Sequence, residues 1–93
     1  MEIEGRAIVV SGGGSGIGRA AVLALAGRGA KVIVADLDET GGRQTVDLAG
    51  AKGGVAVFRH CDVTRTEDLA GAFACAFEHF GRLDVAFNNA GIG

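Results

Sequence analysis

Short apolar runs alternate along the chain with longer segments that carry apolar residues at helical spacing, and this pattern predicts strands and helices in turn. The first two apolar runs are almost uninterrupted, which is typical of parallel strands covered on both faces. The alternation therefore predicts an α/β fold. Strands are predicted at residues 7–11, 31–36, 55–60 and 83–87. Helices are predicted at residues 16–28, from Asp38 or Thr40 to about Leu48, and from the segment 64–67 to a stop at Gly81.

The last predicted helix carries its large apolar side chains on one stripe, which predicts a face buried in the core. Its start contains Thr64 and Glu67, a spacing that predicts a capping box. We expect a core face formed by Leu69, Phe73, Phe77 and Phe80, with Ala72 and Ala76 beside it.

The connections between the predicted strands determine the order of the sheet. Right-handed crossovers carry strands one, two and three outward in one direction, and the next crossover returns to place strand four beside strand one. The expected arrangement is a doubly wound parallel sheet with the order 3-2-1-4. The third strand ends in the polar residues Arg59 and His60, which fits a position near the sheet's edge. Ligands of such sheets lie between the strands whose connections leave in opposite directions, here strands one and four.

A glycine-rich turn, residues 11–18, joins the first predicted strand to the first predicted helix. Gly12 can turn sharply, Gly16 has no side chain to block a pyrophosphate, and Gly18 lets the helix lie close to the sheet. Backbone N–H groups and the positive end of the helix then suit a phosphate. The spacing fails the pattern G-x-G-x-x-G, and Arg19 excludes a P-loop, which ends in Gly-Lys-Ser or Gly-Lys-Thr. The alternative is a glycine-rich turn with no ligand.

This turn and a second segment share their spacing with one protein family. The turn reads Gly12-x-x-x-Gly16-x-Gly18, and Asn-Asn-Ala-Gly follows the fourth predicted strand at residues 88–91. Together they resemble the short-chain dehydrogenase/reductase family, which usually has Thr where this sequence has Ser11. The resemblance covers the whole chain and implies a Rossmann-type fold that binds a nicotinamide dinucleotide. It implies cofactor contacts at Gly12, Ser15, Gly16, Ile17, Gly18, Asn88, Asn89, Ala90 and Gly91.

Asp36 ends the second predicted strand, 18 positions after Gly18. This is near the spacing of a carboxylate that accepts hydrogen bonds from the adenosine ribose. A 2′-phosphate would be repelled there, and neither Leu37 nor Ser15 supplies a basic residue to hold it. We therefore expect NAD rather than NADP, with Asp36 and Leu37 at the cofactor. The alternative for Asp36 is a helix N-cap or a solvated turn carboxylate.

Asp62 and Val63 follow the third predicted strand. The resemblance implies that Asp62 contacts the adenine amino group and that Val63 packs on the ring. The alternative for Asp62 is an ordinary cap or turn residue. For Asn88 and Asn89 the resemblance implies that they steady the central sheet and touch the adenosine side. The alternative there is a polar turn that ends a strand.

Charge and composition argue against several other classes of protein. The net charge is −2 with a pI of about 5.5, so there is no electrostatic basis for nucleic-acid binding. No apolar run reaches the length of a membrane span, and the acidic start lacks the character of a signal peptide. Cys61 and Cys75 fit neither a disulfide framework nor a metal pattern. We expect reduced thiols, a cytoplasmic protein and no metal site.

The resemblance also implies catalytic residues that this sequence lacks. The family uses a Ser and a Tyr-x-x-x-Lys pair, whereas this chain has no tyrosine and carries lysine only at positions 31 and 52. We expect residues 1–93 to be the NAD-binding half-domain of an oxidoreductase acting on alcohols or ketones, truncated before its catalytic segment and unable to turn over alone. The alternative is a non-catalytic nucleotide-binding or assembly module. The unpaired edge at residues 85–87 could then contact another chain or a second copy.

Overall fold

The structure, a computed structural model that describes residues 2–89, has strands and helices in the predicted alternation. The strands are β1 (Ala7–Ser11), β2 (Lys31–Asp36), β3 (Val55–His60) and β4 (Val85–Asn88). The helices are α1 (Gly16–Gly27), α2 (Glu39–Ala51) and α3 (Thr66–Phe80). The predictions for Ala90 and Gly91 lie outside the described residues.

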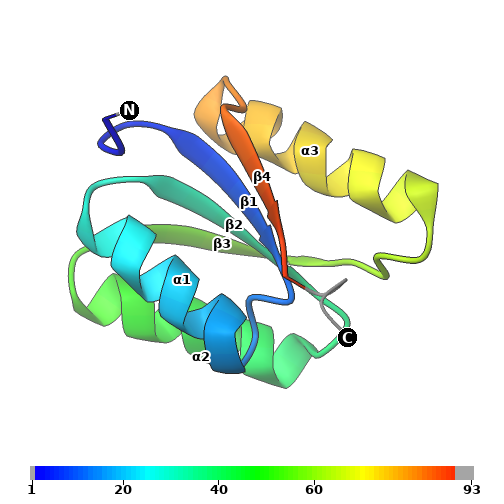
Figure 1. Cartoon of the computed structure of the whole chain (residues 1–93), viewed down its shortest axis with the longest axis horizontal. Coiled ribbons are helices and arrows are strands. Elements are labelled where there is room, and N and C mark those ends of the chain that lie inside the picture. The colour runs from blue at the N-terminus through cyan, green and yellow to red at the C-terminus, as the bar shows by residue number, and fades with distance from the viewer. Residues whose placement is uncertain (1, 90–93) are drawn as a thin grey trace.

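The four strands form one parallel sheet in the order β3-β2-β1-β4, which confirms the predicted doubly wound α/β fold. β1 lies at the centre, where Val9 pairs with Ile33 of β2 and with Ala86 of β4. In Figure 1, α1 and α2 cover one face of the sheet and α3 covers the other. β3 lies at an edge, as its polar end predicted.

Successive side chains of β1 point to opposite faces of the sheet, so the strand contributes to two cores. Ile8 and Val10 pack beneath α1 and α2, whereas Val9 packs beneath α3. The buried residues of the first core are Ile8, Val10, Val22, Ala26, Ala30, Val32, Val34 and Ala49. Those of the second are Val9, Ile33, Ala35, Cys61, Ala72, Cys75 and Ala76. The small helix residues in both sets allow the helices to lie close to the sheet.

Two element boundaries differ from prediction by more than a single residue. α2 continues to Ala51 rather than ending near Leu48, because Gly50 stays helical and the chain turns only at Gly53, where φ is +80°. β4 begins at Val85 rather than Leu83. The reason is Asp84, whose side-chain Oδ2 accepts the Ala7 N–H at 2.8 Å in place of a strand carbonyl.

The predicted core stripe of α3 is wrong at Phe77, which is 57% exposed. A spacing of four residues advances about 40° beyond a full helical turn, so Phe77 has rotated away from the face that Leu69 begins. Ala72, Cys75 and Ala76 are buried on α3 instead. Leu69, Phe73 and Phe80 are partly buried and pack against the second core.

The predicted capping box of α3 is also wrong. The N-cap residue is Arg65, and no side chain caps the helix there. The Thr64 hydroxyl is engaged elsewhere, because it donates to Asp62 Oδ1 at 2.6 Å. Of the helices in residues 2–89, none combines the length and the apolar character needed to cross a membrane.

Candidate functional site

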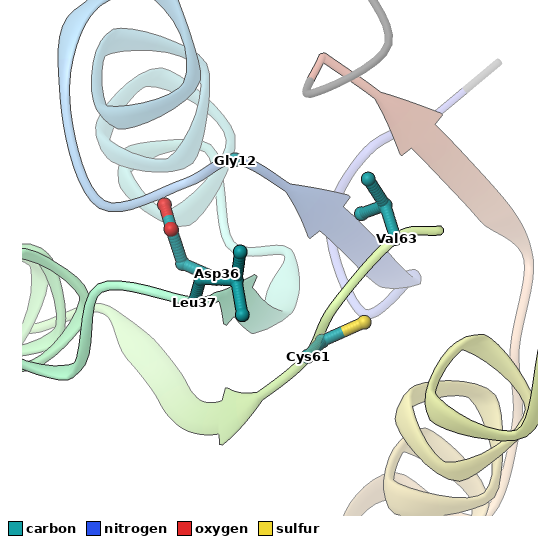
Figure 2. A pocket seen from close by; sticks show the side chains of 5 residues that line it. All are labelled: Gly12, Asp36, Leu37, Cys61 and Val63. Atoms are coloured by element: carbon teal, nitrogen blue, oxygen red, sulfur yellow. The ribbon is translucent and has the colours of Figure 1, made fainter. Parts of the chain in front are cut away.

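The carboxyl ends of β1, β2 and β3 surround a small hollow of about 60 Å³. Figure 2 shows its lining, which comes from the residues that directly follow or end these strands. Ligand pockets usually measure roughly 300 Å³ or more, so a hollow of this size is too small to enclose a whole dinucleotide. Four residues predicted at the cofactor line it together with one cysteine: Gly12, Asp36, Leu37, Cys61 and Val63.

The glycine turn above this hollow has the backbone that its glycines permit. Gly12 and Gly16 adopt φ values of +75° and +57°, which favour glycine. A Cβ at Gly18 would lie 1.9 Å from the Gly12 carbonyl oxygen, so only glycine allows α1 to approach the turn this closely. A Cβ at Gly16 would meet nothing within 4 Å, which leaves open space at the helix start.

The N-terminus of α1 differs from that of α2 in how its N–H groups are used. At α2, Asp38 accepts a hydrogen bond from the Gly41 N–H at 3.1 Å and caps the helix. At α1, the N-cap Ser15 makes no side-chain capping bond, and the first turn has no acidic residue. The predicted contact residues Ser15, Gly16 and Ile17 are exposed here, outside the hollow.

Asp36 is half-buried and faces the glycine turn. Its Oδ2 accepts the Gly14 N–H at 2.8 Å, and its Oδ1 accepts the Asp38 N–H at 2.9 Å. Since Asp38 caps α2, Asp36 is not the N-cap that the alternative reading allowed. A carboxylate oxygen has two lone pairs, so each oxygen retains capacity for another donor. Leu37 beside it is 59% exposed.

The residues after β3 form the opposite wall. Asp62 Oδ1 accepts both the N–H and the hydroxyl of Thr64, at 3.0 and 2.6 Å, and these hydrogen bonds lower the pKa of the Asp62 carboxyl. This is the turn role that the sequence left open for Asp62, and Val63 reaches the hollow beside it. Cys61 was not predicted there, although its position directly after the strand was the available signal. Burial, followed by the charges of nearby carboxylates, raises the pKa of its thiol.

The two asparagines connect β4 to β1. The Ser11 hydroxyl donates to Asn88 Oδ1 at 2.9 Å. The Asn89 side-chain amide donates to the Gly12 carbonyl at 3.3 Å, and its backbone N–H donates to the Ser11 carbonyl at 3.2 Å. Both residues thus lie at the strand ends that border the glycine turn. They are better described as linking residues than as a free polar turn.

Two larger hollows are not lined by the carboxyl ends of the strands. One of about 400 Å³ borders α1 and α2 and is lined by Arg19, Gln44, Asp47 and Leu48. Another, of about 490 Å³, lies at α2 and β3 beside Arg43 and Phe58. We place the candidate site by its glycine turn and carboxylate rather than by volume. Within residues 2–89, no group of three or more His, Cys, Asp or Glu side chains is arranged to hold a metal ion.

The sequence matches the family described as short chain dehydrogenase over residues 6–93. A 2,5-dichloro-2,5-cyclohexadiene-1,4-diol dehydrogenase of Sphingobium indicum is 45% identical over 91 residues, which are 98% of this chain and 35% of that protein. A solved hydroxysteroid dehydrogenase from Escherichia coli is 29% identical with a TM-score of 0.90, over 94% of this chain and 37% of its own. A short chain dehydrogenase/reductase from Burkholderia phymatum in complex with NAD is 32% identical with a TM-score of 0.89, over 92% and 31%. The chain therefore spans about a third of the length of these proteins.

Proposed function

Because this chain belongs to the short-chain dehydrogenase/reductase family, we propose that it binds NAD across the carboxyl ends of β1, β2 and β4. The adenosine would lie between Asp36 and Val63, and the pyrophosphate at the start of α1. One observation carries the proposal: three features lie together at the carboxyl ends of the strands. They are the glycine turn, the half-buried Asp36 and the linking asparagines.

The glycine turn fits a pyrophosphate in two respects. No side chain caps α1, so its first N–H groups are available to phosphate oxygens. The space where a side chain would stand at Gly16 is open. The absence of an acidic residue in the first turn also removes the charge that would repel a phosphate.

Asp36 supports NAD over NADP. Hydroxyls of the adenosine ribose would donate to the carboxylate, and each such charge-assisted bond contributes about 1.5–3 kcal/mol. A 2′-phosphate would instead place two negative groups side by side. Neither Leu37 nor Ser15, the other residues expected near the 2′ position, carries a positive charge to offset that repulsion.

When bound, NAD accepts a hydride from an alcohol carbon, or NADH returns one to a ketone. The chain supplies residues that bind and orient the dinucleotide. It contains no tyrosine to act as the family's general acid/base, so we propose that it does not turn over alone. A second candidate, an assembly module, is favoured by β4, which pairs with β1 alone among the described strands and leaves Phe87 39% exposed.

Calorimetric titration with NAD and with NADP tests the main proposal. We expect NAD to bind at least about tenfold more tightly, and Asp36→Ala to lose most of that preference. Asp47→Ala, which removes an exposed carboxylate on α2, is the control and should keep it. Absence of NAD binding by the folded chain would contradict the proposal, and concentration-dependent sedimentation without nucleotide affinity would favour the assembly module.

A further inference from the structure

The side chain of Arg19, on the first turn of α1, joins the glycine turn to the start of α2. Its Nη2 lies 2.7 Å from the Gly14 carbonyl oxygen and 3.1 Å from that of Gly41. Its Nε donates to the Thr45 hydroxyl oxygen at 2.9 Å, and Thr45 in turn donates to the Gly41 carbonyl at 3.1 Å. One guanidinium therefore connects two segments more than 20 positions apart in the sequence.

The two carbonyls converge because glycines on both segments let the glycine turn pack closely against the start of α2. A Cβ at Gly41 would lie 2.7 Å from the Gly14 oxygen, and a Cβ at Gly14 would lie 3.0 Å from the Gly42 nitrogen. Gly14, Gly41 and Thr45 are all buried. A carbonyl oxygen held away from water needs a donor, and Arg19 supplies one to Gly14 with a positive charge that strengthens the bond. The Gly41 carbonyl accepts from Arg19 as well as from the Thr45 hydroxyl.

Gly14 is held from both sides. Its carbonyl accepts from Arg19, and its N–H donates to Asp36 Oδ2 at 2.8 Å. One oxygen of the Asp36 carboxylate thus accepts from the residue that Arg19 holds, and the other accepts the Asp38 N–H at 2.9 Å. Neither sequence motif singles out Arg19 for this role.

We propose that Arg19 is a positioning residue for cofactor selection: it fixes Gly14, and through Gly14 the carboxylate that distinguishes NAD from NADP. The inference rests on the proposed function of Asp36. An arginine is required because its planar fork reaches the two carbonyls and the Thr45 hydroxyl at once, whereas a lysine is a single point charge.

Positioning and simple charge effects predict opposite changes in selectivity. If Arg19 positions Asp36, Arg19→Met should lower the ratio of the NADP to the NAD dissociation constant, since the carboxylate loses its fixed place. If Arg19 acted only by its charge, its removal would disfavour the 2′-phosphate further, and the ratio would rise. Arg19→Lys keeps the positive charge but loses the planar guanidinium. A positioning role therefore predicts a lower ratio of the NADP to the NAD dissociation constant for this variant too.

The test measures both dissociation constants by calorimetry and the exchange rate of the Gly14 amide proton by NMR without ligand. For Arg19→Met we expect NAD binding about tenfold weaker, the order given by one charge-assisted bond, a ratio at least about threefold lower, and faster Gly14 exchange. Thr45→Val, which removes the acceptor of the Arg19 Nε, should shift the ratio and the exchange rate in the same direction by less. Arg28→Met, an exposed arginine at the other end of α1, should leave all three values unchanged.

An unchanged or raised ratio in Arg19→Met, or unchanged Gly14 exchange, would overturn the inference. If Arg19→Met does not fold, Arg19→Lys and Thr45→Val decide by the same readouts. Failure of the proposed function has a different signature: the unmodified chain would bind no NAD, while the effect of Arg19 on Gly14 exchange would still be measurable.

Discussion

The side-chain amide of Asn89 donates to the carbonyl oxygen of Gly12 and so ties the end of β4 to the turn after β1. The same Gly12 carbonyl stands against Gly18 of α1, where an added Cβ would also lie 2.9 Å from the Asn89 Nδ2. Turn, helix and neighbouring strand therefore meet around one peptide group. The conformation of the glycine turn depends on this junction, which the phosphate site would share.

Gly18→Ala should disrupt this junction. The new methyl group meets backbone at Gly12, which cannot move aside like a flexible side chain. Overpacking of this kind costs about 1–3 kcal/mol, and we expect the upper end of that range together with weaker NAD binding. Denaturant unfolding gives the free energy, and titration gives the affinity.

Gly27→Ala is the matched control on the same helix, because a Cβ at Gly27 meets nothing within 4 Å. Its unfolding free energy should stay within about 1 kcal/mol of the unmodified chain, or rise. Equal effects of the two substitutions would show that helix propensity, and not the contact with Gly12, determines the outcome.

Gly42→Ala should destabilise α2 despite alanine's better helix propensity. Its Cβ would lie 2.2 Å from the ring of Phe58, over which the Arg43 guanidinium is also placed at 5.4 Å. We expect a loss of about 1–3 kcal/mol, measured by thermal unfolding. Gly50→Ala, in the same helix with open space around it, should gain about 0.5–1 kcal/mol.

A compensating substitution separates this contact from other causes. Phe58→Leu shortens the side chain opposite Gly42, so the double variant should be less destabilised than the sum of the two single variants. Strict additivity would mean that the ring does not limit the approach of α2 to β3.

Protonation of the Asp84 carboxylate should lower the free energy of unfolding at acidic pH. Hydrogen bonds from the Arg82 guanidinium, then from the Ala7 N–H and Arg6, hold the pKa of its carboxyl well below the usual range. The unfolded-state value is about 4. The folded state thus gains stability from Asp84 above pH 4 and loses it as the pH falls below that value toward the folded-state pKa.

Unfolding free energies measured between pH 2 and 7 check this expectation. Asp84→Asn should flatten the decline below about pH 4 and lower the stability at neutral pH. Asp47→Asn removes a carboxylate that is exposed on α2 and should preserve the decline. A parallel decline in the unmodified chain and in Asp84→Asn would assign the acid sensitivity to other groups.

The strand order and the residues that follow the carboxyl ends of the strands could be predicted because they follow from patterns along the whole chain. Uninterrupted apolar runs at β1 and β2, helical spacing between strands and right-handed crossovers all depend on local periodicity. Asp36, Gly12 and Asn89 could be placed near one another for the same reason, since the carboxyl ends of parallel strands meet at one edge.

The features that the sequence did not predict depend on contacts between distant segments. Phe77 is exposed because the neighbours that pack α3 select Ala72, Cys75 and Ala76 for the buried face. The Thr64 hydroxyl donates to Asp62 Oδ1, and no side chain accepts the first N–H groups of α3, whose N-cap residue is Arg65. The hydrogen-bond partners of Arg19 include residues about 25 positions away in the sequence. No pattern of nearby residues predicts such contacts.

The Asp84 cluster lies at the amino ends of β1 and β4, and the glycine turn lies at their carboxyl ends. The length of a strand therefore separates the acid-sensitive contacts of Asp84 from the groups that would meet a ligand. Substitutions at Arg6 or Arg82 should therefore change the response of the fold to acid through Asp84, with no direct contact to the proposed cofactor site. Substitution of Asp36 at the opposite ends of the strands should change ligand preference without touching these contacts.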